Sequence, residues 1–280
     1  MRLKSLELLL RTENRSRLYL VQHCWEGKKV FCIRCENRKN YRLADKRYRC
    51  SNCGYTFHDF TGRWIGQLNL SSRQWLWALK LFELEVPMRR LTGEIGISYP
   101  TALKAGNLIR CAIAQNAHDL LPKNDAETHQ IYAACCNKAA RRRPTRENSP
   151  IFGVSRHRGQ VELALVREVD AKALRYENVA TIQRGSIVYT GRFREYDALI
   201  FWDGISKGAG QEKKPRGQLD EEFWSFLNRR VGRFQGSPIR RFPLYLIELA
   251  FRYNHRNDQL FETLAHYTTR LVPDDLKSCF

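Results

Sequence analysis

The sequence predicts an α+β protein in which a small metal-binding module and a helix-turn-helix precede a larger body of strands and helices. Two cysteine pairs, Cys32-x2-Cys35 and Cys50-x2-Cys53, lie close together early in the chain. Downstream, a short helix, a turn at Gly96 and a second helix follow one another. From residue 127 the composition changes to short strand-like runs separated by helical segments, which indicates a layered α/β body.

The cysteine pairs predict a structural zinc site. Each CxxC pair puts two sulfurs on one knuckle, and two knuckles can complete a tetrahedron around Zn²⁺ with Zn–S bonds of about 2.3 Å. Disulfides in a secreted protein are the alternative, but the remaining cysteines form no framework and make the total odd. Those cysteines are Cys24, Cys111, Cys135, Cys136 and Cys279. Cys135 and Cys136 are expected to be small buried residues.

The charge of the chain favours nucleic acid as its partner. The 280 residues include 48 Lys and Arg against 29 Asp and Glu, a net charge of +19. This excess favours binding to a phosphate backbone, and we expect double-stranded DNA. No apolar run approaches the roughly 18 residues of a membrane span. The leucine run near the N-terminus is broken by Glu7 and precedes no cleavage site, so we expect no signal peptide and a cytoplasmic, nucleoid-associated protein.

Four segments are expected along the chain. Residues 1–27 are predicted to hold an N-terminal helix over 3–22. Residues 28–60 are predicted to form a zinc ribbon with short strands at 41–43, 48–50 and 55–57. Residues 61–120 are expected to form the helix-turn-helix, with helices beginning after Ser71, at Met88 and after the cap Ser98. An ordinary helical hairpin is the alternative for this segment.

Residues 125–272 are predicted to form an α/β domain compatible with an RNase H-like core. Strands are expected at 127–134, 150–155, 161–166 and 186–190. Helices are expected at 171–182, 219–231 and 243–254. Phe223 and Trp224 are expected in the core of a late helix, and His157 and His255 at the surface or at strand ends.

Several segments together resemble insertion-sequence transposases that carry an N-terminal zinc ribbon, a helix-turn-helix and an RNase H-like, ISXO2-like domain of the DDE type. The resemblance covers about residues 20–265. It rests on Cys32-Ile33-Arg34-Cys35, Tyr48-Arg49-Cys50-Ser51-Asn52-Cys53, residues 57–64 and 73–78, Ile151-Phe152-Gly153-Val154, residues 185–190, Glu221-Glu222-Phe223-Trp224-Ser225 and Phe251-Arg252-Tyr253-Asn254-His255-Arg256.

The resemblance implies three acidic residues that hold two Mg²⁺ ions for DNA strand cleavage and transfer. Here two of the three positions carry other residues. The first falls at His129 and the second at Gly191, whereas the third is retained as Glu221. Glu127 lies on the same strand face as His129 and is a possible substitute. We therefore expect a transposase-derived DNA-binding protein without the two-metal reaction, in which Glu221 can be an ordinary helix-start acid.

Two alternatives stay open. An active DDE-type transposase could use a relocated acidic set of Glu127, Glu221 and either Asp197 or Asp203, with Asp197 on a helix after the fourth strand; only this alternative requires Mg²⁺. A partner-binding scaffold without DNA function is the other. A homo-oligomer is also expected. The predicted DNA contacts are Arg34, Arg38, Lys39, Arg42 and Arg47 on the ribbon, Tyr99, Thr101 and Lys104 on the second helix, and Arg141, Arg142 and Arg143, which could instead form only a solvated loop.

Overall fold

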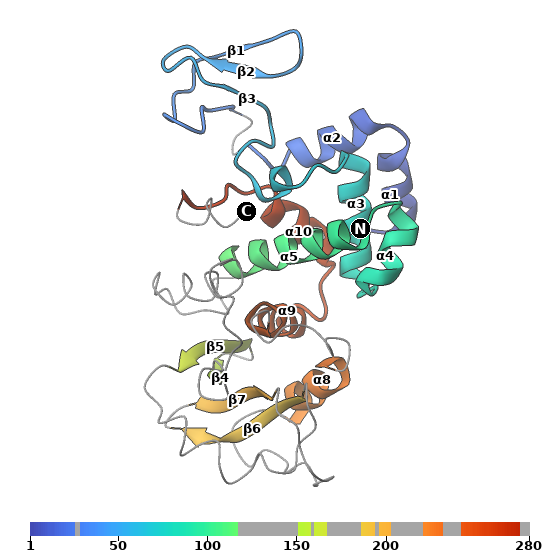
Figure 1. Ribbon diagram of the computed structural model, residues 1–280, viewed down its shortest axis with the longest axis vertical. Coiled ribbons are helices and arrows are strands. Elements are labelled where there is room, and N and C mark those ends of the chain that lie inside the picture. Colours follow the sequence, from blue (N-terminus) through green and yellow to red (C-terminus); the bar gives the residue numbers. More distant parts are fainter. Residues whose placement is uncertain are drawn as a thin grey trace. The chain divides into compact units, whose positions relative to one another are not determined.

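The computed structural model describes residues 1–25, 29–116, 151–157, 160–166, 186–193, 196–202, 221–231 and 242–274 (Figure 1). The chain divides into two compact units. The first unit comprises Met1–Ala112 together with the C-terminal segment from Asp258, and the second runs from Ile113 to Asn257. Among the described residues, no helix combines the length and hydrophobicity that a bilayer crossing demands.

The N-terminal segment forms two helices, α1 (Leu3–Leu10) and α2 (Glu13–Val21), where the sequence predicted one. Thr12 separates them because its extended backbone and its hydroxyl, which accepts from Arg15 N at 3.2 Å, start a new helix. Ser16 is fully buried and donates its hydroxyl to Leu9 O at 2.9 Å, so the two helices are fixed across the break.

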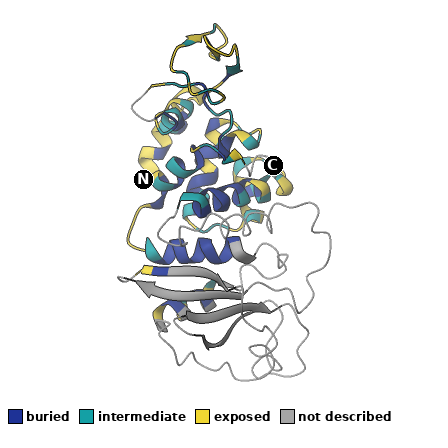
Figure 2. Ribbon diagram, turned by 90° about the vertical axis from the view of Figure 1, so that its left-hand side faces the viewer, coloured by how far each residue is buried: buried dark blue, intermediate teal, exposed yellow. Residues whose placement is uncertain are grey.

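The ribbon is a three-stranded antiparallel sheet of β1 (Asn40–Arg42), β2 (Tyr48–Cys50) and β3 (Thr56–Phe57), in the order β1-β2-β3. Its three expected strands are present within a residue or two of the predicted positions. The aromatic rings of Tyr48, Phe57 and Trp25 pack together at its base, with Trp25 to Phe57 centroids 6.3 Å apart. In Figure 2 much of the ribbon, drawn at the top, is coloured as exposed. Short segments with so small a core generally require an additional stabilising element such as a metal site.

The helix-turn-helix follows a short 3₁₀ segment, η2 (Trp64–Gln67), and helix α3 (Ser72–Glu83). As predicted, Ser71 caps α3, in a reciprocal arrangement with Gln74. Helix α4 (Met88–Ile95) ends at Gly96 in the left-handed conformation (φ 71°, ψ 41°), and α5 (Tyr99–Asn116) follows. Gly96 makes the turn at little steric cost, which confirms the role predicted for it.

The C-terminal segment folds back onto the first unit through α10 (Leu260–Thr268), which packs on α3. Phe261 N donates to Glu83 Oε1 at 2.9 Å, so a carboxylate of α3 caps the start of α10. Buried Arg63 then pairs as a β-bridge with Leu271 and donates to Thr269 O at 2.5 Å. Residues up to 272 were expected in the second domain, but the segment from Asp258 belongs to the first unit.

The second unit contains a four-stranded antiparallel sheet in the order β5-β4-β7-β6. Its strands are β4 (Ile151–His157), β5 (Gln160–Val166), β6 (Ser186–Phe193) and β7 (Tyr196–Trp202). The expected strand at 127–134 and helix at 171–182 lie outside the described residues.

Two expectations about this sheet were wrong. Strand β6 continues past Thr190 through Gly191 to Phe193, because it pairs with the unforeseen strand β7 across a register shift between Tyr189 and Gly191. Asp197 lies within β7, opposite Arg192, and not on a helix.

Helices α8 (Glu221–Val231) and α9 (Phe242–Asn254) complete the described part of this unit, close to their predicted bounds. Phe223 is buried, with its ring centroid 4.9 Å from that of Tyr253, which confirms its place in the core. Asn254 accepts from Val161 N at 2.8 Å and donates to Val161 O at 2.9 Å. Its amide thereby takes the place of a neighbouring strand along β5.

Candidate metal centre and nucleic-acid interface

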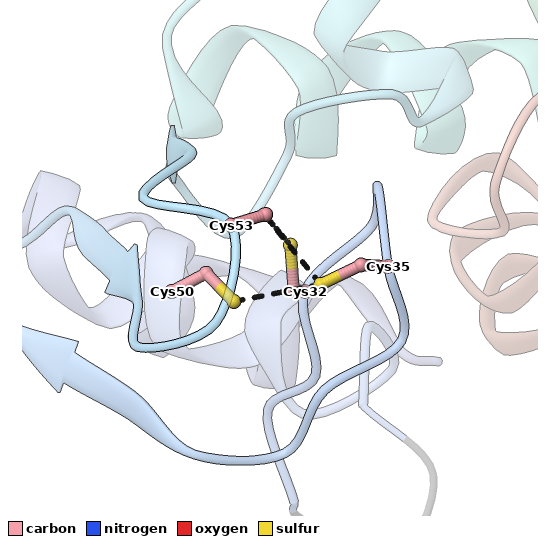
Figure 3. Close-up of side chains that lie close together, drawn as sticks. All are labelled: Cys32, Cys35, Cys50 and Cys53. Carbon is pink, nitrogen blue, oxygen red and sulfur yellow. Dashed lines mark hydrogen bonds between the residues drawn. The ribbon is translucent and has the colours of Figure 1, made fainter.

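The four ribbon cysteines converge on one point (Figure 3). Their sulfurs all lie within 4.8 Å of one another, with Cys32–Cys53 and Cys35–Cys50 at 3.6 Å and Cys35–Cys53 at 3.5 Å. Zn–S bonds of about 2.3 Å at tetrahedral angles require sulfurs roughly 3.8 Å apart, so the cluster has the size of a Zn²⁺ site. Among the described residues it is the only cluster of potential metal ligands this close.

Both knuckles have the same backbone design. The residue after the second cysteine of each pair, Glu36 or Gly54, takes positive φ (57° and 68°). Its amide donates back to the first cysteine of its pair, with Glu36 N to Cys32 O at 2.8 Å and Gly54 N to Cys50 O at 3.1 Å. These turns bring the two sulfurs of each pair to one side, as CxxC spacing requires.

Donors around Cys50 favour the thiolate form of this cysteine. The backbone N–H of Cys53, followed by the N–H of Asn52 and the side chains of Cys35 and Asn37, lowers the pKa of Cys50 to about 6. Asn52 N lies 3.4 Å and Asn37 Nδ2 3.7 Å from the Cys50 sulfur. Because zinc binds thiolates, these donors favour Cys50 as a metal ligand, whereas the pKa of Cys53 is raised to about 11 among the neighbouring sulfurs.

A buried carboxylate joins the ribbon to the helices. Asp59, which is 1% exposed, pairs with Arg17 of α2 and accepts from Trp25 Nε1 at 3.1 Å and Tyr48 Oη at 3.4 Å. Arg63 lies over the Trp25 ring, with its guanidinium carbon 4.4 Å from the ring centroid. The Asp59 side chain therefore connects the segment after β3, in which it lies, with helix α2 and strand β2.

The predicted ribbon contacts Arg34, Arg38, Lys39, Arg42 and Arg47 are all exposed. Arg47 differs from the others because Asp45 holds its Nε at 2.6 Å. The remaining four form no hydrogen bond or ion pair through their side chains with any described residue. Their charges are therefore available to a phosphate backbone.

The start of α5 is presented to solvent. Tyr99 is 45% exposed, Lys104 is exposed, and Thr101 is half-buried beside Ser98, with their hydroxyl oxygens 2.8 Å apart. After this first turn and a half, α5 becomes largely buried. Only its N-terminal end can therefore reach a ligand, which is the end that a recognition helix uses on DNA.

The sequence did not predict the cation that lies beside this helix end. Arg89 and Arg90 of α4 are exposed, and the Arg89 guanidinium carbon lies 6.0 Å from the Tyr99 ring centroid. The available sequence signal for a DNA contact was their position at the start of α4, the helix that precedes the turn at Gly96. Helical spacing alone did not show that α4 would bring Arg89 beside the next helix.

The three positions where the resemblance implies acids are only partly described. Gly191 lies inside β6, paired with Ala198, and Glu221 is the first residue of α8, a helix that packs against β6. His129, Glu127, Asp203 and the arginines Arg141, Arg142 and Arg143 lie outside the described residues. The structure therefore brings together the elements that carry the second and third positions.

Comparison with known proteins gives matches over both units. Residues 11–56 match the transposase zinc-ribbon domain, and residues 130–254 match the ISXO2-like transposase domain. A protein of Halobacterium salinarum, described as an uncharacterized protein in transposable element ISH50, is 25% identical over 218 residues. The alignment covers 70% of this chain and 73% of that protein. No solved structure matches.

Proposed function

Because the chain carries the zinc-ribbon and ISXO2-like domains of a transposase, we propose that it binds duplex DNA through the ribbon and the helix-turn-helix and does not cleave it. The observation that carries the binding half is the exposed N-terminal end of α5. Tyr99, Lys104 and, on α4, Arg89 surround it. A helix that offers its N-terminal side chains beside phosphate-binding cations fits the major groove.

The ribbon supplies the second contact of the proposal. Its exposed cations include Arg34 on the first knuckle and Arg42 on β1. Cations of this kind strengthen binding without reading sequence, because they replace counterions along the phosphate backbone. We therefore assign affinity mainly to the ribbon and sequence preference mainly to α5.

The residues at the expected metal positions support the proposed lack of cleavage. Two-metal catalysis needs carboxylates that bridge two hard cations. Gly191 brings no ligand, and a neutral His129 suits a borderline metal better than Mg²⁺. The nearest described acid in the sheet, Asp197, pairs in register with Arg192 and Val154 and not with Gly191. Glu221 would then serve its helix start as a favourable N-terminal charge.

Binding of a labelled duplex at several salt concentrations tests the proposal. We expect affinity to fall steeply with salt, with a slope near −0.9 for each phosphate contacted. Lys104→Ala should reduce the steepness of this salt dependence by the amount expected for one phosphate contact. Lys4→Ala, which removes an exposed lysine from α1, should leave the slope unchanged. Binding that ignores salt, or equal effects of the two variants, would contradict the proposed interface. Sedimentation of the free and DNA-bound protein tests the predicted homo-oligomer.

A further inference from the structure

The two faces of the ribbon sheet differ in character. On one face Tyr48 and Phe57 stand opposite each other in register, with ring centroids 5.6 Å apart, and pack into the ribbon core. The other face carries Tyr41, Arg49 and Thr56, since Tyr41 pairs with Arg49 and Arg49 with Thr56. The face formed by Tyr41, Arg49 and Thr56 is the outer face of the ribbon.

The outer face exposes an aromatic ring among cations. Tyr41 is 66% exposed, more than any other large hydrophobic side chain among the described residues. Arg49 is exposed opposite the ring on β2, and Lys39, two residues before Tyr41 in the chain, is exposed as well; neither side chain pairs with a described acid. Phosphates alone would require only the cations, so the ring points to a ligand that offers a flat apolar surface as well as negative charge.

The ring is held on a rigid base next to the cysteine cluster. Asn40, which precedes Tyr41, pairs with the metal-site residue Cys50, and its Nδ2 donates to Val30 O at 3.1 Å. Ser51 donates both its amide and its hydroxyl to Lys39 O, at 3.1 and 2.9 Å. A platform fixed on both sides by the knuckles loses little freedom when a ligand stacks on it.

We propose that the outer face binds unpaired nucleotides of single-stranded DNA, with a base stacked on Tyr41 and phosphates held by Lys39 and Arg49. Bases inside a duplex have both faces covered by their neighbours, so stacking on a side chain requires an unpaired base. This inference rests on the proposed DNA binding and adds to it a second substrate form, such as an overhang or an opened end.

Fluorescence anisotropy with the full-length, zinc-loaded protein tests the inference. The affinities for a labelled oligothymidine and for a labelled duplex are measured at one ionic strength, and their ratio is compared among variants. Tyr41→Ala should lower the ratio of single-strand to duplex affinity about 5- to 150-fold, the range for loss of one stacked base. Tyr41→Phe keeps the ring and should keep most of the ratio. Leu18→Ala is the matched control, since it removes a side chain 53% exposed on α2.

The outcomes separate the two proposals. An unchanged ratio in Tyr41→Ala, with duplex binding by the wild-type protein intact, overturns the outer-face inference and leaves the proposed function standing. A wild-type protein that binds neither DNA form overturns the proposed function itself. Zinc content is measured for every variant, and loss of zinc in Tyr41→Ala contradicts the assignment because Tyr41 would then support the fold.

Discussion

Replacing Asp59 with alanine should uncouple the zinc ribbon from the helices that carry it. Asp59 is 1% exposed, and its carboxylate pairs with Arg17 and accepts hydrogen bonds from Trp25 and Tyr48. Removing one partner of a buried ion pair costs roughly 3–5 kcal/mol, because the other charge stays unpaired. The Arg17 side chain is 22% exposed and can regain some hydration, so we take the lower end, about 3 kcal/mol.

Zinc affinity gives a direct assay of this loss. If the ribbon folds only with its metal, destabilising the bound state weakens apparent zinc binding by the same free energy. A loss of about 3 kcal/mol corresponds to roughly 100-fold in dissociation constant, measured by competition with a chelator of known affinity. Asp59→Asn keeps an acceptor for Trp25 and should lose closer to tenfold.

Asp45→Ala is the matched control for this prediction. It also removes a carboxylate that pairs with an arginine of the ribbon region, but its side chain is 47% exposed. An exposed pair contributes little to stability because solvent screens its charges, so zinc affinity should change little. Equal losses of zinc affinity in Asp59→Ala and Asp45→Ala would show that the burial of Asp59 is not the source of its effect.

Three further predictions concern the first unit. Truncation after Asn257 removes α10 and should reduce both DNA binding and the unfolding temperature. The reason is that the buried Arg63 loses its hydrogen bond to Thr269 O in the returning segment. An unchanged melting curve would contradict this prediction. Glu13→Ala leaves the first amides of α3 without their acceptor and should cost about 1 kcal/mol in urea unfolding, with Glu7→Ala as the exposed control. The pKa of His23 is lowered from 6.5, mainly by burial and then by the nearby His266. As the pH falls, the unfolded state therefore binds the proton before the folded state does, so stability should decrease below about pH 6.5. His23→Gln should make the urea midpoint less dependent on pH in this range.

The parts of the fold that sequence predicted well depend on local rules. Spacing alone determined the cysteine cluster, because a CxxC knuckle needs only a few residues to place its sulfurs. Ser71 and Gly96 were also predictable, since a cap and a left-handed turn restrict the choice of residue. The break at Thr12 had a signal of the same kind, a threonine followed by Glu13, but the leucine pattern on both sides hid it.

The errors came from long-range pairing. Strand β6 extends through Gly191 because β7 provides its hydrogen-bond partners, and β7 was not recognised although Ala198 to Trp202 is an apolar run. The return of α10 depends on Glu83 capping Phe261, a contact between residues far apart in the chain. The periodicity of apolar residues depends on local spacing, so it does not predict contacts between distant residues. The same reason explains why Arg89 beside Tyr99 was missed.

DNA binding without cleavage is measured by incubating a labelled duplex with the zinc-loaded protein and following both binding and cleavage in the presence of Mg²⁺ or Mn²⁺. We expect a complex whose affinity falls steeply with salt and no metal-dependent cleavage product. Cleavage that requires Mg²⁺ or Mn²⁺ and disappears in Glu221→Ala would instead show that the protein is an active nuclease with a relocated catalytic site.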